Sequence, residues 1–258
     1  MRVAIAGKGG AGKTTISATI ARLSAQRGQQ VVAIDADANP NLAIALGFSP
    51  EDASRLGPIP PTLMSRRLGG PGLTGPLDEV IDRFALMGPD GVRLIGMGAP
   101  AHADEGCLCS AHAMVSAVLE DLGGRTETLV VIDMEASPEH LSRGTIRHAD
   151  VLCLIAEPYY RSLETVRRMA ALAAELRLPS VVVIANKIRS AADGSAVSEF
   201  CARHDLRLAG LVPWSDDVIA ADRARVCVVD SARTRDVTAA VSEFCTHLQL
   251  PGHQPSSV

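Results

Sequence analysis

The stretch GKGGAGKTT, residues 7–15, decides the fold of this chain. It directly follows the apolar run VAIA and precedes ISATIARLSAQRG, whose apolar residues recur at helical spacing. Gly7, Gly12, Lys13 and Thr14 fit the pattern G-x-x-x-x-G-K-[ST], in which a glycine-rich loop joins a strand to the start of a helix. The stretch predicts a phosphate-binding loop, since a turn without a ligand would leave its lysine and threonines without a role in packing.

The residue types of this loop suit a nucleotide and its magnesium ion. Glycines let successive backbone N–H groups turn toward phosphates, and the N-terminus of the following helix adds a favourable dipole. Lys13 is expected to neutralise the β- and γ-phosphate oxygens, and the Thr14 hydroxyl is expected to ligate Mg²⁺. The predicted nucleotide-binding residues are Gly9, Gly10, Ala11, Gly12, Lys13, Thr14 and Thr15.

Outward from the loop, apolar β-branched runs alternate with helical patterns along nearly the whole chain. Strands are expected at 2–6, 31–35, 92–96, 129–133, 151–156, 181–185 and 208–212, and helices at 14–27, 78–86, 112–122, 161–177, 195–203 and 234–247. Continuous apolar runs are typical of strands that helices cover on both faces. The pattern predicts an α/β fold with a doubly wound, mostly parallel sheet flanked by helices.

The chain is 258 residues long, and no repeat or shift in composition divides it. We expect a single domain over 1–248 that contains the phosphate-binding loop, followed by a flexible tail at 249–258. Residues 49–76 include GPIPP and GGPGLTGP, and proline and glycine at that density disfavour a helix or a central strand. This stretch is expected to be a surface insertion.

Composition argues against several classes of protein. Hydrophobic residues make up 47% and aromatic residues 3%, which suits a soluble core of Ala, Val, Ile and Leu. The net charge of −4 argues against sequence-independent nucleic-acid binding, which needs a concentrated basic surface. No stretch reaches the roughly 18 uncharged apolar residues of a membrane span, and the apolar start is too short for a signal peptide. We expect a cytoplasmic enzyme that binds neither nucleic acid nor membrane.

The loop carries a second lysine, Lys8, where a phosphate-binding loop normally needs one. In this respect it resembles the deviant loop of the dimeric ATPases that include nitrogenase iron protein, the septum-positioning MinD proteins and the plasmid-partition ParA proteins. The resemblance implies a P-loop ATPase with the nitrogenase iron protein-like fold, in which Lys8 reaches across a homodimer interface to the partner's nucleotide and acts in catalysis. The logic is that of an arginine finger supplied in trans. A solvated loop lysine is the alternative.

Two aspartate-bearing stretches match the same superfamily at the ends of predicted strands. DADANPNL places Asp35 and Asp37 after one strand, and VVIDMEAS places Asp133 at the end of another. The ligand crevice of an open parallel sheet lies outside these carboxyl ends. The resemblance implies that Asp37 orients and polarises the attacking water and that Asp133 holds Mg²⁺ through the water shell of the ion. Aspartates in such places are often only helix caps, above all Asp35.

The residue that senses the γ-phosphate is left open. Relatives commonly carry a glycine within a few residues of this second strand-end aspartate, whereas DMEASPEHLSRGT offers Ser137 and Pro138 before Gly144.

Adenine recognition is expected at a third strand end. IANKI places Asn186 and Lys187 there, where related ATPases set an asparagine amide against the adenine edge. LVPWSDD, around Pro213, resembles their base-cradling loop. An asparagine that only caps the next turn is the alternative.

A second kind of site is indicated by GCLC, which carries Cys107 and Cys109. Ser110 can cap a helix that begins near Ala111, and a helix N-terminus favours the metal-binding thiolate. Two thiolates supply half of a four-coordinate soft-metal site, so the other half would come from a second chain. Two small loop residues or a redox pair are the alternatives. The remaining cysteines, Cys153, Cys201, Cys227 and Cys245, are expected in the core.

Together, GKGGAGKTT, DADANPNL, GCLC and DMEASPEHLSRGT resemble the CooC-type accessory ATPases that mature nickel carbon monoxide dehydrogenase, from residue 1 to about 230. The resemblance implies a homodimer that binds ATP and Mg²⁺ and shares Ni²⁺ or Zn²⁺ between Cys107 and Cys109 of both subunits. It also implies that hydrolysis is coupled to nickel delivery to a client metalloenzyme. The insertion at 49–76 departs from that family, so the client can differ.

Other functions remain open at this point. A nitrogenase-type reductase or cluster carrier would bridge an iron–sulfur cluster, but MEASPEH after Asp133 offers no cysteine. A MinD-like positioning ATPase would carry an amphipathic C-terminal helix, unlike QLPGHQPSSV, and a ParA-like ATPase would need a basic surface. Soft thiolates accept Zn²⁺, Ni²⁺, Cu(I) and iron–sulfur clusters alike, so the metal stays undecided.

Overall fold

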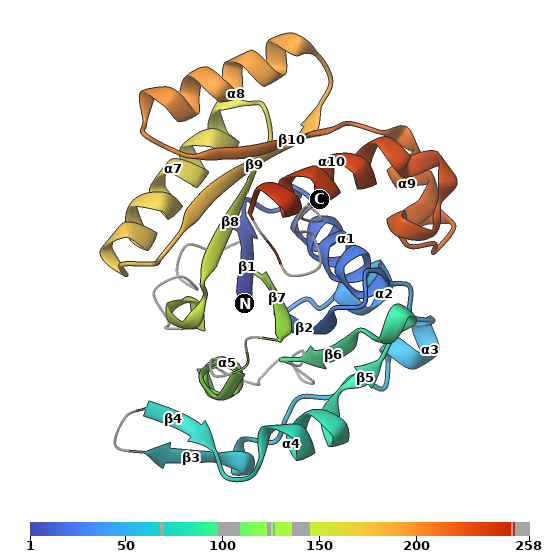
Figure 1. Ribbon diagram of the computed structural model, residues 1–258, viewed down its shortest axis with the longest axis vertical. Helices are drawn as coiled ribbons and strands as arrows, with labels where there is room; N and C mark the ends of the chain where they lie inside the picture. The colour runs from blue at the N-terminus through green and yellow to red at the C-terminus, as the bar shows by residue number, and fades with distance from the viewer. Residues whose placement is uncertain are drawn as a thin grey trace, which may run out of the picture.

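The structure is a computed structural model, and it describes residues 1–67, 70–97, 109–122, 125, 127–135, 145–248 and 250. Its centre is an eight-stranded sheet in the order β10-β9-β8-β1-β7-β2-β6-β5, with helices packed on both faces (Figure 1). Neighbouring strands are parallel except at one edge, where β5 runs antiparallel to β6. The predicted fold class is confirmed.

Each predicted strand is present in the sheet. The strands are β1 (Arg2–Gly7), β2 (Gln30–Ala36), β6 (Arg93–Gly96), β7 (Thr128–Met134), β8 (Val151–Ala156), β9 (Val181–Ile188) and β10 (Leu208–Pro213). The edge strand β5 (Leu86–Met87) was not predicted, because so short a strand leaves no periodic pattern. The phosphate-binding loop follows β1, which lies between β7 and β8 in the middle of the sheet.

The helices form two layers, and each layer closes a hydrophobic core against one face of the sheet. One core contains residues of α1 (Lys13–Gln26), α2 (Leu42–Leu46) and α10 (Arg235–His247). The other contains residues of α4 (Leu77–Phe84), α5 (Cys109–Asp121), α7 (Tyr160–Glu175) and α8 (Ala191–Arg203). Figure 1 shows the layers on opposite sides of the sheet. Strand residues alternate between them: Val3 and Ile5 face the first core, whereas Ala4 and Ala6 face the second.

Helix boundaries depart from the predictions where local hydrogen bonding sets them. Helix α8 begins ahead of the predicted start at 195, because Ser190 and Asp193 form a capping box. The Ser190 hydroxyl accepts the Asp193 N–H at 3.2 Å, and the Asp193 carboxylate accepts the Ser190 N–H at 3.1 Å. Three short helices, α2, α3 (Pro50–Ala53) and α9 (Asp216–Arg223), were not predicted.

The stretch at 49–76 holds more structure than expected of a surface insertion. Pro50 is the first residue of the single turn of α3. The N-cap of this helix is Ser49, whose hydroxyl accepts the Asp52 N–H at 3.1 Å. An antiparallel hairpin of β3 (Met64–Arg67) and β4 (Gly70–Leu73) follows. Ile59 is 4% exposed and Leu73 is fully buried, and both belong to the hydrophobic core. The segment is therefore packed onto the sheet through its apolar residues.

One described residue beyond the predicted domain end at 248 also packs into the core. Leu250 is fully buried, and its N–H donates to the Cys245 carbonyl at 3.0 Å. The remaining residues of the predicted tail lie outside the described residues.

A buried arginine fixes α1, the helix that follows the phosphate-binding loop. The Arg22 guanidinium pairs with Asp90 at 2.6 Å and with Asp230 at 2.7 Å, and it donates to the Leu46 carbonyl at 2.7 Å. The Arg22 side chain is only 3% exposed, so these partners satisfy a charge that burial would otherwise make costly. The network anchors α1 to segments that are distant in sequence.

Candidate nucleotide site

The predicted phosphate-binding loop forms at the carboxyl end of β1. Gly10 and Gly12 have φ angles of +79° and +96°, which residues with a side chain rarely adopt. The turn is closed by the Ala11 N–H, which donates to the Lys8 carbonyl at 3.1 Å, and α1 begins directly after it at Lys13. A helix N-terminus thus lies behind a loop of turned backbone, which is the arrangement that binds phosphate.

An asparagine from β9 braces this loop. The Asn186 amide nitrogen donates to the Ala11 carbonyl at 2.8 Å, and its oxygen accepts the Lys187 N–H at 2.9 Å. A Cβ at Gly12 would overlap the Asn186 side chain, so glycine is required there for packing as well as for conformation. Asn186 is 8% exposed, and its described hydrogen bonds are to backbone.

Two carboxylates lie side by side at the neighbouring strand ends. Asp35 of β2 pairs in register with Asp133 of β7, which pairs in turn with Ile5 of β1. Asp133 is 1% exposed; its Oδ1 accepts the Ser17 hydroxyl at 3.0 Å, and the nearby Thr14 side chain favours its ionised form by lowering its pKa. The structure therefore brings the predicted magnesium ligands Thr14 and Asp133 together.

Ser17 is a residue of this site that sequence reasoning missed. It lies one turn after Thr14 on the same face of α1, and helical spacing was the signal that could have found it.

Both carboxyls ionise with difficulty. Burial raises the pKa of Asp133 to about 7, and the adjacent Asp35 carboxyl adds to this rise. Burial likewise raises the pKa of Asp35 to about 6. A buried carboxylate pair without a cation is costly, which is the condition that metal binding relieves.

Asp35 acts as a local cap, as the alternative interpretation allowed. Its Oδ2 accepts the N–H of Leu42, the first residue of α2, at 2.9 Å, and its Oδ1 accepts the Asp37 N–H at 3.2 Å. It thereby holds the loop that carries Asp37. Asp37 is half-buried, and its carboxylate accepts the Asn39 N–H at 2.8 Å.

A cavity of about 190 Å³ adjoins the phosphate-binding loop on its β9 side. Its lining is Gly12, Thr15, Ile16, Asn186, Lys187, Pro213, Trp214, Ser215, Val218, Ile219 and Val237. The predicted adenine-site residues Asn186, Lys187 and Pro213 therefore share one cavity with the loop. Sequence reasoning missed the apolar wall from α9 and α10, because no motif marks it.

Lys8 is half-buried and lies beside Tyr159, the residue before α7. Its ammonium donates to the Tyr159 hydroxyl at 3.3 Å and lies 5.6 Å from the centre of that ring. Lys187 has a φ of +62°, and its ammonium donates to the Gly10 carbonyl at 2.5 Å. Lys8, Lys13 and Lys187 are all the lysines of the sequence, and the fold gathers them around this loop.

The family model of the CobQ/CobB/MinD/ParA nucleotide binding domain matches residues 3–226. The chain belongs to this family. Carbon monoxide dehydrogenase accessory protein CooC of Rhodospirillum rubrum is 36% identical to it, over 89% of this chain and 90% of that protein. An uncharacterized ATP-binding protein of Methanocaldococcus jannaschii is 34% identical, over 85% and 87% of the two chains. The predicted resemblance to CooC-type proteins within the MinD/ParA group is confirmed, and the chain is an ATPase.

Solved structures agree with the fold of this MinD/ParA-type ATPase. The MinD cell division protein of Aquifex aeolicus superposes with a TM-score of 0.71 at 19% identity, over 96% of this chain and 97% of that chain. The Cyanothece McdA(D38A)–ATP complex superposes with a TM-score of 0.66 at 18% identity, over 96% of each chain. Among the described helices of the ATPase, none has the length and apolar character needed to cross a bilayer.

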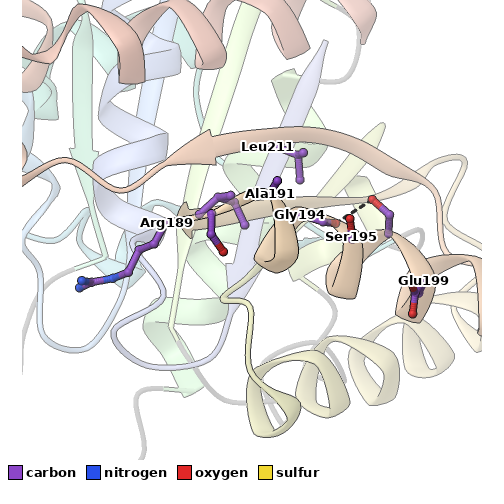
Figure 2. Close-up of a pocket in the computed structure, with 9 residues that line it drawn as sticks. Arg189, Ala191, Gly194, Ser195, Glu199 and Leu211 are labelled. Atoms are coloured by element: carbon purple, nitrogen blue, oxygen red, sulfur yellow. Dashed lines mark hydrogen bonds between the residues drawn. The ribbon is translucent and has the colours of Figure 1, made fainter.

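A second hollow of about 750 Å³ lies away from the loop, between α8 and β10 (Figure 2). It is lined by Ile188, Arg189, Ser190, Ala191, Gly194, Ser195, Ser198, Glu199 and Leu211, which include none of the predicted site residues. The Arg189 guanidinium, from the lining of this hollow, lies 3.9 Å from the centre of the Trp214 ring, which lines the cavity beside the loop. The hollow is open and has no cluster of charged groups beyond Arg189 and Glu199.

The predicted cysteine metal site falls largely outside the described residues. Cys107 is not among them, and of Cys109 only the backbone is described, as the first residue of α5. Within the described part of the chain, no group of three or more His, Cys, Asp or Glu side chains is placed to hold a metal. The segment 136–144, where the γ-phosphate sensor was sought, is likewise not described.

The other four cysteines are core residues, as predicted. Cys153, Cys201, Cys227 and Cys245 are free thiols with at most 3% exposure. Burial raises the pKa of Cys153 to about 12, which keeps this thiol protonated and unsuited to metal binding.

A charge-removing variant tests the electrostatics of the carboxylate pair. The folded-state pKa of Asp133 is raised above its unfolded value, so the folded state favours the protonated carboxyl. The contribution of this group to the stability of the folded state is therefore greatest below about pH 4, and it is lost as pH rises through about 7. Without nucleotide or Mg²⁺, Asp133→Asn should therefore increase the free energy of unfolding at pH 8, by up to about 4 kcal/mol, and change it little at pH 4. Urea unfolding of both proteins at the two pH values measures this, with the exposed Asp82→Asn as control. An equal effect at both pH values would contradict the assignment.

Proposed function

We propose that this chain is a dimeric, Mg²⁺-dependent ATPase that couples nucleotide binding and hydrolysis to nickel delivery for a metalloenzyme such as a carbon monoxide dehydrogenase. The observation that carries the proposal is the similarity to CooC, which extends over 89% of this chain. The phosphate-binding loop and its second lysine support the ATP-dependent part of the proposal. We further propose that residues 1–248 act as one P-loop ATPase domain.

The described residues fit a magnesium nucleotide. The turned backbone at 9–12, the buried Lys13 and the N-terminus of α1 suit the phosphates, while the Thr14 hydroxyl and the Asp133 carboxylate offer the oxygen donors that Mg²⁺ prefers. A bound Mg²⁺ would neutralise negative charge on the β- and γ-phosphates. The cavity lined by Asn186, Lys187 and Pro213 then takes the base.

Two residues are proposed to act on the reaction itself. Asp37 lies on the loop that Asp35 holds at the strand ends, and there it orients the attacking water. Lys8, the second lysine of the phosphate-binding loop, reaches the nucleotide of a second chain. Hydrolysis would therefore require a homodimer.

The metal ion is the cargo of this cycle. Cys107 and Cys109 would bind Ni²⁺ or Zn²⁺ as half of a four-thiolate site, with the same two thiolates from the second subunit as the other half. Nucleotide and metal would then both act on the monomer–dimer equilibrium, and each would change the affinity for the other reciprocally.

A titration tests the shared site. Ni²⁺ and Zn²⁺ are titrated under anaerobic, reducing conditions against the apo, ADP-bound and non-hydrolysable-ATP-bound protein, with sedimentation to report the oligomeric state. We expect one metal per dimer, metal-promoted dimerisation without nucleotide, and an affinity that changes with nucleotide state. Cys107→Ser or Cys109→Ser alone should abolish tight binding, whereas the buried Cys201→Ser serves as the matched control.

Other outcomes would point elsewhere. One metal per monomer, or an affinity unchanged by either replacement, would contradict the shared site. A broad visible absorption band in protein prepared anaerobically would favour an iron–sulfur cluster carrier.

A further inference from the structure

Four side chains form a continuous network beside the phosphate-binding loop. The Lys8 ammonium donates to the Tyr159 hydroxyl, which donates to Glu157 Oε2 at 2.7 Å. Glu157 Oε1 accepts the Lys187 ammonium at 2.9 Å. One carboxylate thus binds the Lys187 ammonium directly and is linked to the Lys8 ammonium through Tyr159. We call these residues, Lys8, Tyr159, Glu157 and Lys187, the Lys8 network.

Glu157 is the most restrained residue of the Lys8 network. Its side chain is 12% exposed, against 31% for Lys187, and its own N–H donates to the Ser162 hydroxyl at 2.9 Å. Because the Tyr159 hydroxyl donates its hydrogen bond to Glu157, its oxygen is free to accept a hydrogen bond from the Lys8 ammonium. Tyr159 is 42% exposed and precedes the first turn of α7. Its hydroxyl is therefore oriented toward Lys8 by a group that is itself held.

Lys8 consequently has a defined position on its own chain. Within the described residues it forms no ion pair, and its contacts are the Tyr159 hydroxyl and the face of that ring. A lysine that lies in one hydrogen-bonded position must give up that bond before it can reach another site. Any contact made in the free chain and broken in the dimer disfavours the dimer by its own free energy.

We propose that Tyr159, oriented by Glu157, is a positioning residue that holds Lys8 on its own chain and thereby restrains nucleotide-dependent dimerisation. This inference rests on the proposed role of Lys8 across the dimer. Lys187 links the same carboxylate to the Gly10 carbonyl and lines the base cavity, so the restraint is built into the nucleotide site itself.

A labelling experiment on the nucleotide-free chain tests the holding of Lys8 directly. The chain is treated with limiting acetic anhydride, and acetylation of Lys8 is followed by peptide mass spectrometry, with the α-amino group as internal reference. Tyr159→Phe keeps the ring and removes the hydroxyl, and it should raise the initial labelling rate of Lys8 by roughly two- to tenfold, the range of one net hydrogen bond. Tyr160→Phe removes the hydroxyl of the neighbouring, 72% exposed tyrosine and should leave the rate unchanged.

A second measurement tests the restraint. With a non-hydrolysable ATP analogue, Tyr159→Phe should lower the dimer dissociation constant by a similar factor, and it should not restore dimerisation to Lys8→Ala, because it acts through Lys8. Tyr160→Phe should leave the constant unchanged, whereas a merely structural effect at the start of α7 would change it in both variants.

The outcomes separate this inference from the proposed function. Equal labelling of Lys8 in wild type and Tyr159→Phe, or a dimer constant that is unchanged or raised by Tyr159→Phe, would overturn the inference. If instead the wild-type chain does not dimerise with nucleotide, the proposed role of Lys8 fails, and the labelling comparison still decides whether Tyr159 holds it.

Discussion

Asp37→Asn should lower the rate of ATP hydrolysis by roughly 10²–10⁴-fold, the usual effect of losing a group that positions or deprotonates a reacting water. The substitution preserves size and the oxygen that accepts the Asn39 N–H, while it removes the charge. Asp35 independently fixes the loop through the Asp37 backbone, so the loop itself should keep its conformation. The reduction should therefore appear in the chemical step and not in binding.

Single-turnover phosphate release and nucleotide affinity measure the two quantities separately. We expect ATP to remain bound and to hold a stalled dimer, which sedimentation would detect. Loss of ATP binding without a stalled dimer would assign Asp37 to the magnesium site or to folding.

Replacement of each of the two loop lysines should impair a different step. Lys13 is 7% exposed at the start of α1, and Lys13→Ala should abolish nucleotide binding because it removes the charge that faces the phosphates of its own chain. Lys8→Ala should leave ATP bound but lose nucleotide-dependent dimerisation, with hydrolysis reduced by on the order of 10³-fold or more, as for a cation supplied in trans.

Nucleotide affinity and sedimentation of both variants decide between these roles. Normal dimerisation and hydrolysis by Lys8→Ala would show that Lys8 is only a solvated loop residue. Mixing Lys8→Ala with an Asp37→Asn chain sharpens the test. In the mixed dimer, the site on the Lys8→Ala chain keeps its own Asp37 and receives Lys8 from the partner, while the site on the Asp37→Asn chain lacks both groups. Activity should therefore recover in part, whereas a lysine that acts on its own chain would give no recovery.

The parts of the molecule that sequence predicts are those whose chemistry is local. The loop at 7–15 carries its pattern within nine consecutive letters, and the central strands are buried on both faces, so their apolar runs are unbroken. Helix α8 shows the limit of this reasoning. Gly194 argues against a helix start before 195, yet the reciprocal hydrogen bonds of Ser190 and Asp193 outweigh it.

The parts that sequence could not predict depend on residues that meet only in the folded chain. Glu157 and Tyr159 follow β8, Lys187 lies one residue before the end of β9, and Lys8 follows β1. Nothing in any one stretch indicates that these residues converge. The packing of Ile59 and Leu73 likewise depends on α5 and the sheet, which glycine and proline content cannot reveal. Glycine and proline content predicts how flexible a segment is in isolation. Whether the apolar side chains of that segment become buried depends on the neighbouring elements of the folded chain.

The stacking of Arg189 on Trp214 has a spectroscopic consequence. Trp214 is the single tryptophan of the chain, and it lines the cavity beside the phosphate-binding loop. Its emission therefore reports on one place only, where a bound base would exclude water from the indole and compete with the guanidinium for its face. The ATPase carries an intrinsic fluorophore in the cavity proposed to take the base, so binding there could be followed in real time without labelling the protein.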